Sequence, residues 1–172
     1  IFKTVRSRAI WLGANLGTAF LASAVINIFE DTIEKVVALA ILMPIVASMG
    51  GVAGSQTLTL AIRSEALGQL VDSNRIWLIK RELAVGAING FVWAAIVAAA
   101  ATIVFDDMLL GGIIASALII NLLIAALAGA VLPGVLKSIG ADPAISGSVV
   151  LTTITDVVGF MSFLGLASFF YA

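Results

Sequence analysis

The chain has 172 residues, of which 62% are hydrophobic and only 11% are charged, and its mean hydropathy is +1.20. Soluble domains average about 45–50% apolar and about 25% charged residues, so this composition predicts an integral membrane protein. The chain has no cysteine and no histidine and a net charge of −1; we therefore expect no disulfide, no usual zinc site, no histidine-based enzyme and no nucleic-acid partner.

Five segments are long and apolar enough to cross a bilayer, because a spanning helix needs about 20 apolar residues for a core of about 30 Å. They are residues 9–29, 36–62, 83–105, 108–136 and 143–171. Of the breaks between them, only 63–82 is long enough for a structured amphipathic connection. The sequence therefore predicts one all-α membrane domain, residues 1–172, that crosses a cell (plasma or inner) membrane several times.

The basic residues predict the orientation of this domain. Eight of the nine lie before the first segment, between the second and third, or after the fourth, and Lys35 is the exception. The positive-inside rule then puts the N-terminus in the cytoplasm and the C-terminus outside. Five acids share the outer side with Lys35, either because acids are tolerated there or because they attract cations to a pore mouth. These acids are Glu30, Asp31, Glu34, Asp106 and Asp107.

The second segment combines small and polar residues within a few helical turns. Gly50 and Gly54 have the G-x-x-x-G spacing of packed helices, and Gly51 lies between them. Five polar side chains accompany them, which suits either hydrogen bonds between helices or a face that lines water. These are Ser48, Ser55, Gln56, Thr57 and Thr59. Four asparagines in or near the segments are expected to bond across helices: Asn15, Asn27, Asn89 and Asn121.

Asp156 is the one charge within the fifth segment, and no lysine or arginine lies inside any predicted segment. A carboxylate at the bilayer centre costs at least about 2.5–3.5 kcal/mol, so an intramembrane acid is a candidate functional residue. Asp156 must be protonated, hydrated in a cavity or matched to a cation from outside. Its helical neighbours at steps of three and four are Ser148, Thr152 and Gly159, which together predict a water-lined face.

Asp142 is the second candidate ligand, at the start of the same segment. It precedes Pro143 and suits an ordinary helix N-cap, which is compatible with a place at the inner pore mouth. Carboxylate and hydroxyl oxygens favour Mg²⁺, with Mn²⁺ and Ca²⁺ as alternatives. A two-fold dimer would bring two copies of Asp156 to one axis.

Two motifs resemble the MgtE family of magnesium channels and transporters. One is the run from Pro44 to Thr59, PIVASMGGVAGSQTLT, and the other joins DPA at 142–144 to TTITDVVG at 152–159. The resemblance covers essentially the whole chain and implies a homodimer whose pore is built from the second and fifth helices. In it Asp156 binds hydrated Mg²⁺, and Asp142 lies near the cytoplasmic end. The residues implied to line the path are Gly50, Gly51, Ala53 and Gly54.

The chain departs from the family pattern at two places. Val52 replaces the asparagine of G-G-N-A-G, and residues 147–149 read GSV where S-G-P is usual, so ion selectivity is open. Many members also carry an N-terminal cytosolic sensor that closes the gate when Mg²⁺ binds. The 172 residues contain none, so we expect either a piece of a longer protein or a naturally short member.

The predicted function is therefore a Mg²⁺ channel with Ser148, Thr152 and Asp156 on its path. A divalent-metal exchanger coupled to H⁺ or Na⁺ is the alternative, and a non-transporting membrane scaffold would leave Asp156 without a role. An Asp pair for catalysis is excluded within one chain, because Asp142 and Asp156 lie about 21 Å apart along one helix.

Overall fold

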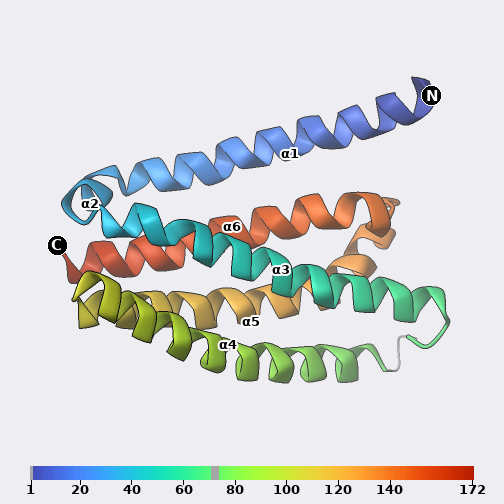
Figure 1. The fold of residues 1–172 in the computed structure, drawn as a ribbon. Coiled ribbons are helices and arrows are strands. Elements are labelled where there is room, and N and C mark those ends of the chain that lie inside the picture. The colour runs from blue at the N-terminus through green and yellow to red at the C-terminus, as the bar shows by residue number, and fades with distance from the viewer. Residues whose placement is uncertain (1, 71–73) are drawn as a thin grey trace.

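The computed structural model describes residues 2–70 and 74–172, and within them the regular structure is entirely helical, as the composition predicts. In chain order the helices are α1 (Phe2–Ile28), α2 (Glu30–Lys35), α3 (Ala38–Ala66), α4 (Arg75–Phe105), α5 (Met108–Ser138) and α6 (Pro143–Phe170) (Figure 1). Five of them are long and apolar enough to span a membrane, namely Arg8–Ile28 of α1 and all of α3, α4, α5 and α6. The prediction of five spans is confirmed.

The long connection expected between the second and third spans is mostly helical in the structure. α3 continues to Ala66 and α4 already begins at Arg75, eight residues before the predicted start at 83. Charged side chains do not end a helix when its backbone hydrogen bonds continue, so apolar length alone misplaces helix ends. Residues 71–73 of the expected connection lie outside the described residues.

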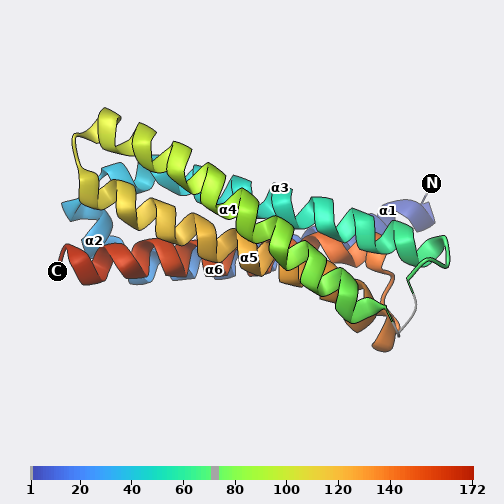
Figure 2. The same cartoon turned by 90° about the horizontal axis from the view of Figure 1, so that it is seen from below.

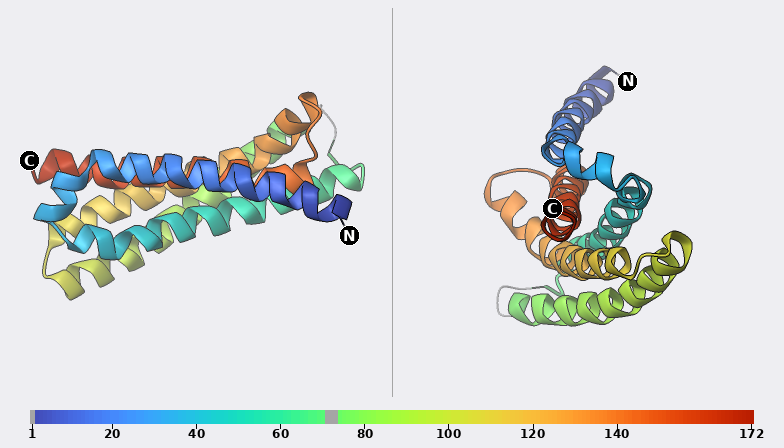
Figure 3. Two further views of the ribbon diagram at one scale, coloured as in Figure 1. Left: turned by 90° about the horizontal axis from the view of Figure 1, so that it is seen from above. Right: turned by 90° about the vertical axis from the view of Figure 1, so that its left-hand side faces the viewer.

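α5 is the centre of the bundle. It packs along α3, α4 and α6, while α1 lies on the outside against α6 (Figures 2 and 3). Within the most apolar window of each span, 56% of α5 residues are buried against 11% of α1 residues. Most of α1 therefore presents apolar side chains to its surroundings, as a span in lipid does.

The two ends of the bundle differ in charge. The N-terminus and the α3–α4 and α5–α6 connections lie at one end, and α2, the α4–α5 turn and the C-terminus lie at the other (Figure 1). The first end carries Arg63, Arg75 and Lys137, and the second carries the acids of α2 with Asp106 and Asp107. The fold thus separates a basic end from an acidic end, as the alternation of charges along the chain predicts.

α5 and α3 approach each other at Gly129. A Cβ atom at Gly129 would lie 2.7 Å from the carbonyl oxygen of Gly54 and 2.8 Å from Cβ of Thr57. These are fixed atoms of a neighbouring helix, so no side chain fits there without moving the helices apart. Small residues at such points let backbones touch, which is the main source of helix association in lipid.

A polar contact ties the end of α6 to the start of α5. The Tyr171 hydroxyl donates to Oδ2 of Asp107, whose Oδ1 accepts from the Leu110 backbone amide at 3.0 Å and so caps α5. The hydrogen bond from Tyr171, followed by that from Leu110, lowers the pKa of Asp107 below its ordinary value. Burial is the main cause that raises the pKa of Tyr171, followed by its hydrogen bond to Asp107 and the negative charge of Asp107.

We expect Gly129→Ala to lower the free energy of unfolding by about 1–3 kcal/mol, because the added methyl group overpacks the α3–α5 contact. Gly112→Ala is the matched control on the same helix, since a Cβ there meets nothing within 4 Å. Thermal unfolding in detergent measures both. Equal unfolding temperatures for the two variants would contradict the close contact.

We expect Tyr171→Phe to lower the unfolding temperature at neutral pH by about 2–4 °C, the shift produced by losing about 1 kcal/mol. A carboxyl whose pKa is lower in the folded than in the unfolded state stabilises the fold at pH values above its unfolded pKa, here 3.8. This stabilisation is lost as the pH falls through the pKa of the folded state. The difference between wild type and variant must therefore shrink as the pH falls below about 4. A difference that stays constant from pH 7 to pH 3 would contradict the assignment.

Candidate functional site

A hollow whose mainly apolar lining also carries several polar side chains lies on the face shared by α3 and α6, and it opens to the outside of the single chain. Its volume is about 830 Å³. We call it the α3–α6 hollow. Its lining residues are Ala47, Ser48, Gly51, Val52, Ser55, Gln56 and Thr59 of α3 with Thr152 and Asp156 of α6.

The periodicity of α3 explains why its polar residues gather in the hollow. Ser48, Val52, Ser55 and Thr59 follow one another at steps of four, three and four, so they share one face of the helix. Thr57 falls on the opposite face, where its hydroxyl donates to Glu82. Four of the five polar side chains of the second segment therefore line the hollow, and the fifth bonds to a neighbouring helix.

Two hydroxyl groups of the hollow, those of Ser55 and Thr152, donate to carbonyl groups of their own helices. Ser55 Oγ donates to the Gly51 carbonyl at 2.7 Å, and Thr152 Oγ1 donates to the Ser148 carbonyl at 2.9 Å. A hydroxyl oxygen that donates in this way keeps its lone pairs free. The hollow therefore offers oxygen acceptors, the kind of group that a hydrated cation contacts.

Asp156 is half-buried in the wall of the hollow, one helical turn after Thr152. Among the described residues, no lysine or arginine forms an ion pair with it. Within the part of the chain that the structure describes, no internal salt bridge therefore accounts for this membrane carboxylate. Asp156 borders the open hollow.

Asn121 of α5 holds the two walls of the hollow together from behind. It is fully buried, and its Nδ2 donates to the Val46 carbonyl of α3 at 2.9 Å. Its amide also lies against Gly50 of α3 and Gly159 of α6, where a Cβ would come within 2.3 Å and 2.7 Å of Nδ2. The expected bond between helices is confirmed for Asn121, while Asn89 bonds within its own helix, to the Val85 carbonyl. Asn121 Oδ1 has no partner among the described residues.

The structure brings only some of the predicted site residues together. Gly51, Thr152 and Asp156 line the hollow, whereas Gly50 and Gly54 are buried against other helices and Ala53 lines a separate groove toward α4. That Gly50, Ala53 and Gly54 line a path in an assembled pore stays a prediction.

The face predicted from steps of three and four along α6 is only partly open. Gly159 is buried against Asn121 and Val46, because α6 packs on α3 and α5 at this level. Ser148 is exposed but lies outside the hollow, and it offers its carbonyl to Thr152. The open part of the face therefore runs from Ser148 to Asp156.

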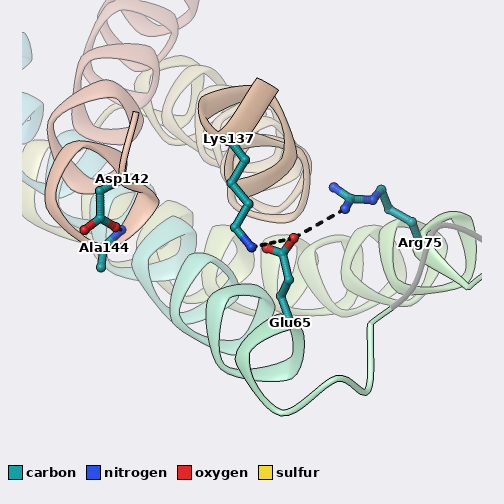
Figure 4. A network of polar contacts seen from close by, with 5 residues as sticks. All are labelled: Glu65, Arg75, Lys137, Asp142 and Ala144. Atoms are coloured by element: carbon teal, nitrogen blue, oxygen red, sulfur yellow. Dashed lines mark hydrogen bonds and ion pairs between the residues drawn. The ribbon is translucent and has the colours of Figure 1, made fainter. Parts of the chain in front are cut away.

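Asp142 caps α6, as its position before Pro143 predicts: its Oδ1 accepts from the Ala144 amide at 2.9 Å (Figure 4). It is exposed at the basic end of the bundle. At the same end of the bundle, Glu65 at the end of α3 pairs with Lys137 of α5 at 2.9 Å and with Arg75 of α4 at 3.7 Å (Figure 4). This network joins three helices beside the place where Asp142 begins α6.

Glu82 is a buried acid that the sequence analysis passed over. It was assigned to the connection 63–82, but it lies inside α4, is 6% exposed and accepts from Thr57 Oγ1 at 3.0 Å. The sequence contains the pattern that predicts its burial: Leu78, Glu82, Gly86 and Gly90 are spaced by four, and they form the buried face of α4.

These features define an integral, multi-pass helical membrane protein with an oxygen-lined hollow and an unpaired acid at membrane depth. A family model described as MgtE, divalent cation transporter, matches residues 43–166. The match covers α3 to α6 except for their outermost residues, and it includes the whole hollow. The chain belongs to the MgtE family, which is a family of transporters rather than enzymes.

Three curated relatives carry the name magnesium transporter MgtE. The one from Bacillus subtilis (strain 168) is 32% identical over 163 residues, and the one from Thermus thermophilus is 31% identical over 164 residues. The one from Enterococcus faecalis is 27% identical over 168 residues. The alignments cover 94–98% of this chain but only 36–37% of each relative, so the chain spans little more than a third of their length.

We expect Gly50→Ala to lower the free energy of unfolding by about 1–3 kcal/mol in the wild-type background, because the methyl group would collide with Asn121. In an Asn121→Ala background the collision is removed, so the two changes must couple by about 0.5–3 kcal/mol. Gly51→Ala is the control, since a Cβ there meets nothing within 4 Å. Additive effects of Gly50→Ala and Asn121→Ala would contradict the packing behind the hollow.

Proposed function

We propose that two copies of this chain form a channel for Mg²⁺, with the two α3–α6 hollows facing each other across the pore axis. The observation that carries the proposal is the unpaired carboxylate of Asp156 in an oxygen-lined hollow. Placing this charge at membrane depth costs at least about 2.5–3.5 kcal/mol on insertion scales, and no cationic side chain of the described residues offsets it. A cation in the pathway offsets it.

The composition of the hollow supports an ion that keeps its water. Within the described residues, no group of three or more acids exists that could hold a bare metal ion. Mg²⁺ gives up its water reluctantly and is often held by one or two carboxylates through its waters. Six waters occupy about 180 Å³ at about 30 Å³ each, which the hollow of about 830 Å³ accommodates.

The open side of the hollow supports a second copy as the missing wall. Polar side chains that face lipid are costly, and a two-fold axis beside α3 and α6 would cover those of the hollow with an identical surface. The axis would also place a second Asp156 opposite the first. Two carboxylates and the hydroxyl oxygens then surround the hydrated ion.

The remaining predicted residues take supporting places in this proposal. Asp142 and the basic end around it form the cytoplasmic mouth, in keeping with the positive-inside rule. Gly50 and Gly54 permit the close packing that fixes the wall. Val52 puts an apolar side chain on the hollow where the family pattern has asparagine, so discrimination of Mg²⁺ from Mn²⁺ and Ca²⁺ is the property most open to change in this chain.

Names of relatives support Mg²⁺ as the ion, since all three are called magnesium transporters. With the basic end in the cytoplasm, the membrane potential favours inward flow by about 2.3 kcal/mol per charge per 100 mV.

We expect Asp156→Asn to reduce Mg²⁺ flux into liposomes at least about tenfold, which corresponds to losing about 1.4 kcal/mol of interaction with the ion. Asp106→Asn is the matched control, because Asp106 is exposed at the α4–α5 turn and outside the hollow. Flux in Asp156→Asn equal to wild type, with folding and dimerisation intact, would remove Asp156 from the pathway.

The same assay separates the channel from the alternatives. Channel flux follows the Mg²⁺ gradient and the voltage alone, whereas an exchanger coupled to H⁺ or Na⁺ needs a counter-gradient. Loss of flux when the pH and Na⁺ differences are clamped would favour the exchanger, and no flux under any gradient would favour the scaffold.

A further inference from the structure

A second site lies in the groove between α3 and α4, next to the α3–α6 hollow, with which it shares the lining residues Val52 and Gln56. α4 packs along α5 and barely touches α3, so a space of about 570 Å³ stays open between them, with Leu122 and Ala126 of α5 at its floor. We call it the α3–α4 groove. Apart from Val52 and Gln56, its lining residues lie outside the hollow. The groove needs an occupant because gaps between helices that face lipid are filled.

The groove has the length of one lipid tail. Along α4 it runs from Arg81 to Trp93, which is about 18 Å at 1.5 Å per residue. Half of a hydrocarbon core of about 30 Å is about 15 Å. The groove therefore spans one leaflet, with its deep part walled mainly by apolar side chains and its polar head at Arg81.

Arg81 is placed for a phosphate group. It is exposed at the basic end of the bundle, and its guanidinium lies 5.5 Å from the centre of the Trp77 ring on the preceding turn. Tryptophan and arginine at this level are the usual anchors at a membrane interface. A guanidinium binds phosphate oxygens through paired, charge-assisted hydrogen bonds.

Glu82 is the acid of the α3–α4 groove, and it would favour a lipid headgroup with a positive charge. It lines the same groove, is 94% buried, and accepts one hydrogen bond on Oε2 from Thr57, while Oε1 has no hydrogen-bond partner among the described residues. No ion pair neutralises it within the described residues. A primary ammonium group supplies both a positive charge and hydrogen-bond donors, which a quaternary ammonium lacks. An anionic headgroup would put its charge against this carboxylate.

We propose that the α3–α4 groove binds one aminophospholipid, with its phosphate at Arg81, its primary ammonium at Glu82 and one tail along α4 to Trp93. The charge pattern of the groove, one fixed cation beside one buried anion, is the complement of a zwitterionic headgroup with a primary amine. The bound lipid covers the flank of α3 that faces α4.

Native mass spectrometry of the purified protein tests this proposal. The protein is equilibrated in detergent with equal amounts of phosphatidylethanolamine, phosphatidylcholine and phosphatidylglycerol that share the same acyl chains. We expect phosphatidylethanolamine to be retained about tenfold over the other two, the gain from one charge-assisted hydrogen-bonded pair. Equal retention of all three, a preference for phosphatidylglycerol, or no retained lipid would overturn the proposal.

Variants separate the two parts of the headgroup site. Glu82→Gln keeps an acceptor for Thr57 and must abolish the preference for phosphatidylethanolamine over phosphatidylcholine. Arg81→Gln must weaken the binding of both, and Lys80→Gln is its control because Lys80 is the adjacent exposed cation outside the groove. Val85→Trp fills the groove and must displace lipid of every headgroup, so it tests the site even if Glu82→Gln does not fold.

Two further outcomes would overturn the proposal that a lipid occupies the α3–α4 groove. If Glu82→Gln lowers the number of bound Mg²⁺ ions and leaves lipid retention unchanged, the groove is a cation site. If lipid is retained by the monomer but never by the dimer, a second copy covers the groove instead.

Discussion

The close approach of α5 to α3 and α6 is the contact on which the rest of the structure depends. In lipid, helices gain little from burying apolar side chains, so they hold together through close packing and hydrogen bonds. Gly129 lets α5 touch the backbone of α3, and Gly50 and Gly159 leave room for the buried amide of Asn121. One central helix thereby fixes the distance between the two helices that carry the α3–α6 hollow.

Fixing α3 in this way gives its two flanks different surroundings. One flank, with Ser48 and Ser55, meets α6 and Asp156 at the hollow; the other, with Thr57, meets Glu82 in the α3–α4 groove. Each flank therefore has one acid, and neither acid is paired with a cation among the described residues. The two acids differ in access, since Asp156 is half-buried at an open hollow and Glu82 is almost fully buried. This difference in access is the reason why we propose an ion at the first acid and a lipid headgroup at the second.

Apolar length and helical period were enough to predict the five spans and to place Thr152 and Asp156 on one face of α6, although Gly159 of that predicted face is buried. They misplaced the start of α4, because the charges from Arg75 to Glu82 read as a solvated connection although the backbone there is helical. They also put Gly159 on the water-lined face, where the structure buries it, and left Gly50 and Gly54 undecided between helix packing and lining water. Spacing tells which residues share a face but not which helix covers it. A residue pattern within one chain likewise cannot tell which surface faces the open hollow, because one chain supplies only half of a two-fold interface.

The most direct test of the account is the position of a bound divalent ion in crystals of the protein grown with Mn²⁺, located by anomalous scattering. The account predicts a single peak on a two-fold axis between the Asp156 carboxylates of two protomers, with the α3–α6 hollows facing each other. Separate peaks away from the axis, or a dimer whose α3–α6 hollows face lipid, would contradict it.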